Sequence, residues 1–207
     1  MDLVLATRNA HKVRELRSLL KILHGIDLYS LRDFPEYTPP LETGDSFEHN
    51  ARGKAANAAR RLEKWTLADD SGIVVPALGG SPGILSARYA GEGAGDKENR
   101  NKLLKEMASL EGIARSAYFE CVLALASPDG EIYKVVHGIC EGEILTEVRG
   151  GNGFGYDPLF RKYEYSQTFA ELDEMVKNQV SHRAKAIEKL LFSLESLILK
   201  EEQSIVP

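Results

Sequence analysis

Two adjacent aspartates, Asp69 and Asp70, most constrain how this chain can fold. They follow a short, largely apolar run at residues 65–67 and precede Ser71 and Gly72. Neighbouring carboxylates repel each other, and burying them costs free energy unless cations or hydrogen-bond donors lie beside them. Mg2+ is a common cation for this purpose, because it prefers oxygen ligands. The same residue types also favour a surface turn. The pattern therefore predicts a strand that ends in an acidic turn, which is either a metal site or a plain surface turn.

The composition indicates a folded protein with a real core. Of its 207 residues, 43% are hydrophobic and 28% are charged, which is ordinary for a globular domain. We predict a single domain spanning residues 1–207, a length that also allows two closely packed lobes. The net charge of −5 argues against direct nucleic-acid binding, which needs a basic face. A small local cluster of Lys and Arg can still hold one nucleotide.

Two further features bear on the compartment. The two cysteines, Cys121 and Cys140, lie in apolar, strand-like segments without metal-binding spacing, which favours buried thiols in a reducing compartment. The first residues show no targeting pattern. No window reaches the roughly 18 apolar residues that a membrane span needs. The sequence therefore predicts a cytoplasmic protein without a membrane segment.

The chain opens with a strand-loop-helix pattern. Residues 3–6 are continuously apolar, and residues 13–20 carry apolar side chains at helical spacing. The loop between them, residues 7–12, contains Thr7, Asn9 and Lys12. A helix N-terminus favours anions, and a lysine adds a full charge, so the loop is a candidate phosphate site. Alternatively, Thr7 or Asn9 caps the helix and Lys12 is solvated.

A candidate metal ligand precedes the next helix. Glu42 lies in a loop before a long alanine-rich helix that we place at about residues 46–64. It can face Asp69 and Asp70 and complete a metal site, or it can simply favour the positive end of the helix dipole. The later patterns predict strands near 26–31, 117–126 and 131–139, and helices near 96–110, 168–177 and 181–198.

A glycine-rich segment at residues 150–158 is the second unusual feature. Its glycines let the backbone approach a ligand closely, and Phe154 and Tyr156 offer flat faces on which a base can stack. Asp157 adds a hydrogen-bond acceptor. The alternative is a mobile turn with two core aromatic residues, and the pattern does not decide between these interpretations.

Two basic residues lie in the first turn of the last predicted helix. His182 and Arg183 follow Ser181, which has the character of an N-cap. A cation at this position opposes the helix dipole. We therefore expect both side chains to serve something other than the stability of this helix.

Taken together, these segments closely resemble the inosine triphosphate pyrophosphatase family, also described as Ham1-like. The resemblance covers nearly the whole chain, the bacterial-type form of the family fits best, and Leu85, where an aromatic residue is common, is a minor departure. The motifs that carry the resemblance are TxNxxK at Thr7, Asn9 and Lys12, ETGDSFEHNA from Glu42, ADDSG at 68–72, PGILSARYAG at 82–91, GGNGFGYDP at 150–158, Lys177, and SHR at 181–183.

The resemblance implies a fold and an activity. The expected fold is an elongated, two-lobed α/β structure with a long central mixed β-sheet flanked by helices, commonly assembled as a homodimer. The implied activity is Mg2+-dependent hydrolysis of the non-standard purine nucleotides ITP, dITP and XTP to the monophosphate and pyrophosphate. Such an enzyme cleanses the nucleotide pool and prevents incorporation of these nucleotides into DNA and RNA.

The resemblance also implies roles for individual residues. Asp70 is expected to be the general base, and Glu42 and Asp70 are expected to contribute to the metal site. The residues expected to hold the triphosphate are Thr7, Arg8, Asn9, Ala10, His11, Lys12 and Ser71, and those expected to hold the nucleoside are Phe154, Gly155, Tyr156, Asp157, Lys177, His182 and Arg183.

Two other functions fit the sequence less well. A nucleotide sensor on the same scaffold that has lost turnover would be expected to lack Asp70, Glu42 or Lys12, and all three are present. A Maf-like pyrophosphatase acting on modified pyrimidines would not readily explain the glycine-rich motif together with SHR. The hydrolase of non-standard purine nucleotides is therefore the function that the sequence predicts.

Overall fold

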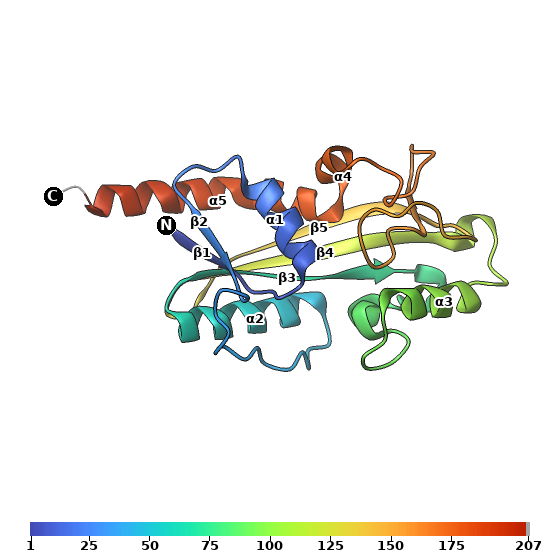
Figure 1. Ribbon diagram of the computed structural model, residues 1–207, viewed down its shortest axis with the longest axis horizontal. Coiled ribbons are helices and arrows are strands. Elements are labelled where there is room, and N and C mark those ends of the chain that lie inside the picture. The colour runs from blue at the N-terminus through green and yellow to red at the C-terminus, as the bar shows by residue number, and fades with distance from the viewer. Residues whose placement is uncertain (206–207) are drawn as a thin grey trace. The chain divides into compact units, whose positions relative to one another are not determined.

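The computed structural model describes residues 1–205 and shows an α/β fold built on a six-stranded mixed sheet (Figure 1). Strand β1 runs parallel to both β2 and β3, whereas β5 and β6 are antiparallel. The α/β fold with a mixed sheet and flanking helices is thereby confirmed. The strands, in their order across the sheet, are β2 (Asp27–Ser30), β1 (Asp2–Leu5), β3 (Trp65–Val74), β4 (Ser116–Ala126), β5 (Ile132–Ile144) and β6 (Phe160–Lys162).

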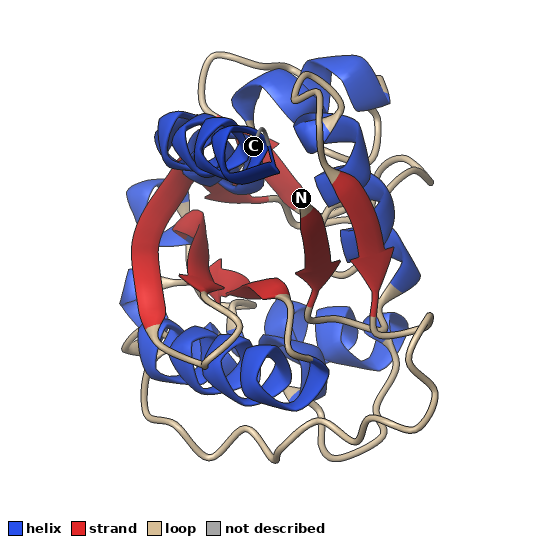
Figure 2. Ribbon diagram, turned by 90° about the vertical axis from the view of Figure 1, so that its left-hand side faces the viewer, coloured by secondary structure: helices blue, strands red, loops and turns tan. Residues whose placement is uncertain are grey.

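The described residues also form helices, which are drawn in blue in Figure 2. Among those that the structure describes, none combines the length and the apolar character needed to cross a bilayer. The α-helices are α1 (Ala10–Leu20), α2 (Phe47–Leu62), α3 (Asp96–Glu106), α4 (Glu174–Val180) and α5 (His182–Ile205), and the short 3-10 helices are η1 (Pro76–Leu78), η2 (Gly83–Arg88) and η3 (Gly112–Arg115).

Side-chain caps explain where two helices begin. The Asn9 side chain accepts hydrogen bonds from the backbone N–H groups of His11 and Lys12, and Ser46 caps α2 through the N–H of His49. The N-terminal loop therefore ends at Asn9, and Lys12 belongs to the first turn of α1 rather than to the predicted loop. The helix predicted at 168–177 was also misplaced, because α4 begins only at Glu174.

The chain divides into two compact units. The first comprises Met1–Asp70, Cys121–Gly138 and the chain from Arg183 onward. Within it, α1 and α5 cover one face of β1, β3 and β4, and α2 covers the other face (Figures 1 and 2). The alanine-rich character of α2 serves this packing, since Ala51, Ala55, Ala58 and Ala59 are buried.

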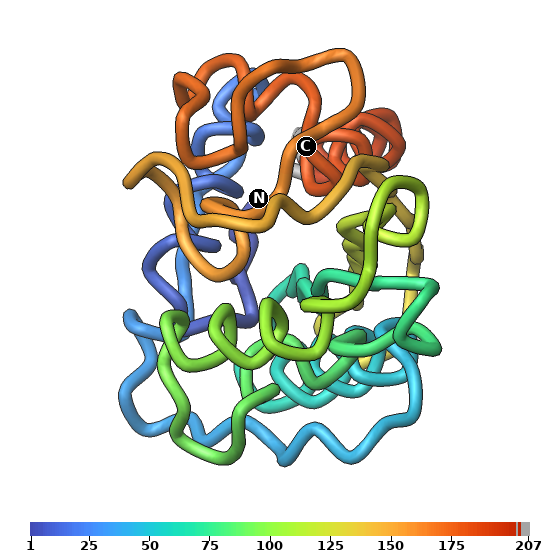
Figure 3. The backbone as a smooth tube through the Cα atoms, turned by 90° about the vertical axis from the view of Figure 1, so that its right-hand side faces the viewer, coloured from blue at the N-terminus to red at the C-terminus, as the bar shows by residue number. Residues whose placement is uncertain are grey.

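The second unit comprises Ser71–Glu120 and Ile139–His182. Its core contains the packed rings of Phe119, Phe160 and Phe169. Much of the segment that joins β6 to α4 has no regular secondary structure, as the orange part of the tube in Figure 3 shows. Buried side chains and backbone hydrogen bonds hold this irregular segment in place.

Strand β3 overturns the prediction of an acidic turn. It continues without interruption from Trp65 through both aspartates to Val74, so the strand does not end at Asp69, and the surface-turn alternative is equally wrong. Successive side chains of a strand point to opposite faces of the sheet. The two carboxylates therefore separate, and each meets its own cations. This separation removes the need for a turn to relieve their repulsion.

Candidate functional site

Asp69 lies in a buried cluster on the face of β3 that α1 and α5 cover. Its side chain pairs with Lys12 of α1, and Arg183 Nε donates to Asp69 Oδ2 at 2.8 Å. The Cys121 thiol donates to the same oxygen at 3.2 Å. Arg183, 1% exposed, also pairs with Glu15. Two carboxylates and two cations thus neutralise one another inside the first unit.

The environment fixes the ionisation of this cluster. Burial alone would raise the pKa of Asp69, but the charges of Arg183 and Lys12 outweigh burial and hold that pKa well below its ordinary value. Burial and the Asp69 carboxylate together raise the pKa of the Cys121 thiol well above its ordinary value. Asp69 is therefore a permanently charged counter-ion, which makes it a poor proton acceptor, and Cys121 remains a hydrogen-bond donor.

The depressed pKa of Asp69 predicts how stability changes with pH. In acid, the folded state binds fewer protons at Asp69 than the unfolded state does, so the contribution of Asp69 to the free energy of unfolding falls as the pH drops below its ordinary pKa of 3.8. The stability difference between the wild type and Asp69→Asn should therefore shrink between about pH 5 and about pH 3. Urea unfolding at several pH values measures this difference. A constant difference over that range would contradict the assignment.

Asp70 lies on the opposite face of β3, beside α2. Asn50 Nδ2 donates to Asp70 Oδ2 at 3.1 Å, and Lys54 Nζ donates to Asp70 Oδ1 at 2.7 Å. The same ammonium lies 3.0 Å from Glu42 Oε1 and 2.8 Å from the carbonyl oxygen of Asp69. Asn50 and Lys54 are one helical turn apart and share a face of α2. Three oxygen atoms therefore converge on one cationic group.

The pKa of Asp70 moves in the opposite direction to that of Asp69. Burial raises the pKa of Asp70, and the Lys54 charge opposes this rise without cancelling it. Burial alone would lower the pKa of Lys54, but Asp70 and Glu42 raise it. The pKa values of the neighbouring carboxylates Asp69 and Asp70 are thus shifted in opposite directions. Such a pair has the character of an acid-base site. Asp70 is the one that accepts a proton more readily.

The N-terminal segment that was expected to hold phosphates is only partly arranged as predicted. Asn9 caps α1, as the alternative interpretation proposed, and Thr7 Oγ1 accepts from the Asn9 N–H at 3.1 Å. Lys12 is not solvated, because it pairs with Asp69. Arg8 is exposed and donates to the carbonyl of Tyr37 at 2.6 Å. The remaining predicted members of this set are Ala10 and His11, which are exposed, and Ser71, which is half-buried in β3.

The second unit holds most of the residues predicted to bind the nucleoside. Lys177 is 5% exposed, and its Nζ lies 2.6 Å from Asp157 Oδ2 and 5.4 Å from the centre of the Phe154 ring. The same Asp157 oxygen accepts from the Phe154 N–H at 3.0 Å. Gly155 follows within the same turn. The structure thus brings Phe154, Asp157 and Lys177 into one cluster.

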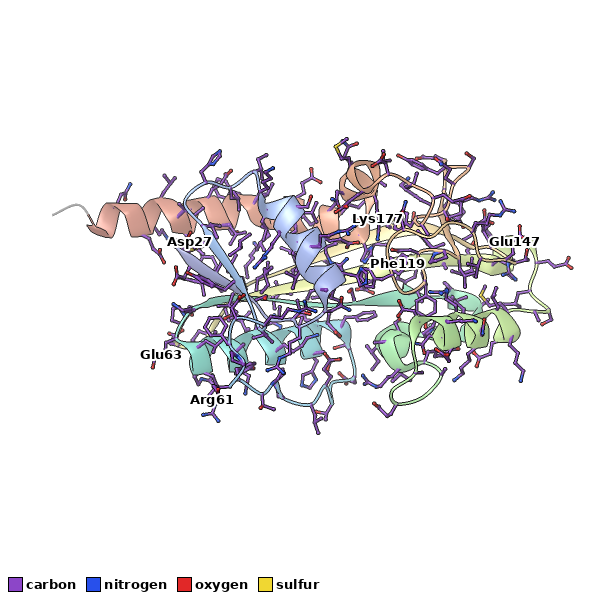
Figure 4. The ribbon with its side chains drawn as sticks, in the orientation of Figure 1. Asp27, Arg61, Glu63, Phe119, Glu147 and Lys177 are labelled. Atoms are coloured by element: carbon purple, nitrogen blue, oxygen red, sulfur yellow. The ribbon has the colours of Figure 1, made fainter. Side chains whose placement is uncertain are left out.

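Two further members of the predicted nucleoside set, Tyr156 and His182, are buried. The Tyr156 ring is buried in the core, and its hydroxyl donates to the Ser86 carbonyl at 3.0 Å. Of the two aromatic residues in the glycine-rich segment, Phe154 is the one with a partly exposed ring. His182 is buried and stacks on Phe119 with ring centres 4.7 Å apart. Figure 4 labels Phe119, which lies in β4, and Lys177, which lies in α4.

Several contacting residues were missed in the sequence. Asn50 and Lys54 are polar residues on the face of α2 that otherwise carries buried alanines, and that interruption is a signal that could have identified them. Glu15 gives no such signal, because a Glu within α1 is typical of a solvated helix face. Cys121 was correctly expected to be buried, but its contact with Asp69 depends on the sheet order.

Comparison with known proteins agrees with this fold. Residues 3–192 match the model of the Ham1 family. A dITP/XTP pyrophosphatase of Chlamydia abortus is 54% identical over 202 residues, covering 97% of this chain and 98% of the relative. The relative of the same description from Protochlamydia amoebophila is also 54% identical, covering 95% and 99%.

Solved structures give the same result. A HAM1 protein from Coxiella burnetii superposes with a TM-score of 0.85 at 40% identity, covering 95% of this chain and 99% of that one. The Ham1 protein of Staphylococcus aureus superposes with a TM-score of 0.82 at 39% identity, with the same coverage. The family model matches most of the chain, and the chain resembles these relatives over nearly its full length. The chain therefore belongs to the Ham1 family.

Proposed function

We propose that this protein is a dITP/XTP pyrophosphatase, which hydrolyses dITP, XTP and ITP to the nucleoside monophosphate and pyrophosphate. Family membership makes the chain a hydrolase that acts on phosphoanhydride bonds, and its relatives are named dITP/XTP pyrophosphatases. One observation carries the proposal for this chain. Asp70, with a raised pKa, pairs with Lys54, which also pairs with Glu42, while the neighbouring Asp69 is held charged on the opposite face.

In the proposed mechanism, Asp70 is the general base. Release of pyrophosphate requires water to attack the α-phosphorus, and a positioned carboxylate accelerates such a step by removing the proton of the attacking water. The raised pKa of Asp70 makes it a better proton acceptor than an ordinary aspartate. Asn50, which donates to the second oxygen of the Asp70 carboxylate, fixes the orientation of this general base.

The lysine side chains beside the two aspartates would neutralise part of the negative charge of the triphosphate. Lys12 and Lys54 are partly accessible ammonium groups that contact Asp69 and Asp70, respectively. In the proposal, Lys12 acts with its neighbours Thr7 to His11 and with Ser71 to hold the phosphates. Positive groups placed where charge develops stabilise the transition state of phosphoryl transfer.

The residues around Lys54 also fit a magnesium ion. Glu42 and Asp70 would hold it, because their carboxylates already converge on one cationic group, and Mg2+ is bound by one or two carboxylates together with substrate phosphates. Within the described residues, no group of three or more His, Cys, Asp or Glu side chains is placed to hold a metal alone. When bound, Mg2+ supplies charge neutralisation at the phosphate oxygens.

The nucleoside is assigned to the cluster around Phe154. Hypoxanthine and xanthine carry a carbonyl at position 6, whereas adenine carries an amino group. The Lys177 ammonium can donate to that carbonyl but would meet the adenine amino group donor to donor, which leaves polar groups unsatisfied. In the proposal, Phe154 stacks on the base and the Gly155 backbone approaches it. Tyr156, Asp157 and His182 act chiefly by shaping the site, since all three are buried. The role of Arg183 in nucleoside binding rests on the family resemblance alone, because its side chain pairs with Asp69 and Glu15 in the first unit.

Identification of the reaction products tests this function. Purified protein with Mg2+ is expected to convert dITP or XTP to the monophosphate and pyrophosphate far faster than it converts dATP, because adenine mismatches the donors of the site. Chromatography of the nucleotides with separate assays for pyrophosphate and orthophosphate gives the answer. Removing divalent ions with a chelator should stop the reaction. Orthophosphate as the first product would show that attack does not occur at the α-phosphorus.

Other parts of the proposal rest on the family resemblance. We propose that the two units act as one functional domain, that the protein assembles as a homodimer, and that it works in the cytoplasm. Removal of ITP, dITP and XTP from the nucleotide pool would keep these nucleotides out of DNA and RNA.

A further inference from the structure

Two side chains of helix α3 bind the two polar backbone atoms of Gly155. The Gly155 N–H donates to Asp96 Oδ2 at 2.6 Å, and the Gly155 carbonyl accepts from an Arg100 guanidinium nitrogen at 2.6 Å. Asp96 and Arg100 are one turn apart and lie on the same face of α3. Both polar backbone atoms of this single glycine are therefore bound by side chains of one helix, far away in the sequence.

Asp157 also restrains the turn that contains Phe154 and Gly155. Asp157 accepts from the Phe154 N–H at 3.0 Å and pairs with Lys177, and the Asp157 N–H donates back to the Phe154 carbonyl at 3.2 Å. Gly153 and Gly155 have φ angles of 72° and 59°, which only glycine adopts readily. The position of Phe154 is thus restrained by the hydrogen bonds of Asp157 and by the contacts of α3 with the next residue, Gly155.

The contacts of α3 are not explained by the needs of the helix itself. Gly95 is the N-cap and provides no side-chain cap, whereas Asp96 directs its carboxylate to a residue 59 positions away. Arg100 Nε is buried and, among the described residues, has no hydrogen-bond partner. A buried donor without a partner costs stability. The Arg100 side chain is therefore held in a position that satisfies the Gly155 carbonyl and leaves Nε without a hydrogen bond among the described residues.

We infer that Asp96 and Arg100 are positioning residues that set the place of the Phe154 ring and thereby the affinity for the nucleobase. This inference rests on the proposed function, in which Phe154 stacks on the base. Stacking on an aromatic ring depends on the orientation of the ring, and a binding group is effective only when its supporting residues hold it in place. Neither residue touches the reacting phosphorus in the proposal, so binding should suffer while the chemical step is spared.

Steady-state kinetics with dITP test the inference. Asp96→Ala and Arg100→Ala are each expected to raise KM by about fivefold to tenfold, as partial loss of a stacking contact would, with kcat changed less than about twofold. Arg100→Lys, which keeps a donor, should recover most of the affinity. Glu98→Ala and Lys105→Ala remove an acid and a base from the same helix without touching Gly155, and their KM should equal that of the wild type.

A double-mutant cycle separates positioning from a general structural effect. If Asp96 and Arg100 act through Phe154, adding Arg100→Ala to a Phe154→Ala enzyme should leave KM unchanged. Independent, multiplicative effects of the two substitutions would overturn the inference. An unchanged KM in both single α3 variants, with a wild type that releases pyrophosphate from dITP, would also overturn it. A wild type that does not hydrolyse dITP would instead refute the proposed function.

Discussion

Replacement of Asp70 with asparagine should lower kcat for dITP by about a thousandfold, the range expected when a general base is removed. Asparagine has the same shape and still offers one oxygen to Lys54, but it cannot take a proton from water. The fold should survive, because burial already disfavours the charged form of Asp70, as its raised pKa indicates. Stopped assays with dITP, together with circular dichroism of the purified variant, measure both properties.

A surface acid gives the control for this experiment. Asp45→Asn removes a negative charge from the exposed loop before α2, and its kcat should stay close to that of the wild type. A near-normal kcat in Asp70→Asn would exclude Asp70 as the base. If only Asp70→Asn is inactive, the loss follows from the position of the carboxylate rather than from the net charge of the protein.

Replacement of Asp69 with asparagine is expected to act on stability far more than on chemistry. The change leaves the buried guanidinium of Arg183 without one of its two carboxylate partners and removes the partner of Lys12. Breaking a buried ion pair from one side costs about 3–5 kcal/mol. For a chain of this length the melting temperature should fall by about 6–20 °C. Calorimetry and urea unfolding measure the loss.

Asp2 provides the matched control for Asp69. It is also a strand aspartate and pairs with Lys64 at 2.7 Å, but it lies at the surface. Exposed ion pairs contribute about 0–1 kcal/mol, so Asp2→Asn should unfold close to the wild-type temperature. Equal melting temperatures for Asp69→Asn and Asp2→Asn would mean that the buried cluster does not stabilise the first unit as its geometry indicates.

Much of the architecture could be predicted from local patterns. The apolar run of β1, the alanine stripe of α2 and the amphipathic pattern of α5 each depend on residues near one another in the sequence. The helix predicted at 168–177 failed for the same reason, because residues 168–173 are held by hydrogen bonds to the distant Asp157 and Phe160 rather than by a helix. Local periodicity carries no information about such partners.

The aspartate pair illustrates the limit more sharply. The need for compensating cations was correctly inferred from two adjacent carboxylates, but the sequence could not show that the strand continues through them. Whether a cation reaches Asp69 or Asp70 depends on which helix covers which face of β3. The sequence could mark Lys54 as unusual but could not show which aspartate it contacts, and it gave no sign of Glu15. The functional roles of the predicted site residues remain predictions.

The alternation of β3 makes the strand sensitive to length rather than only to composition. Inserting one residue before Asp69 would turn every following side chain to the other face of the sheet. Asp69 would then take the position of Asp70 beside Lys54, and the inserted residue would take the position beside Arg183. Two adjacent aspartates thus owe their different chemistry to the alternation of side chains along one strand, and an insertion that preserved every side chain would still move Asp69 into the environment of Asp70.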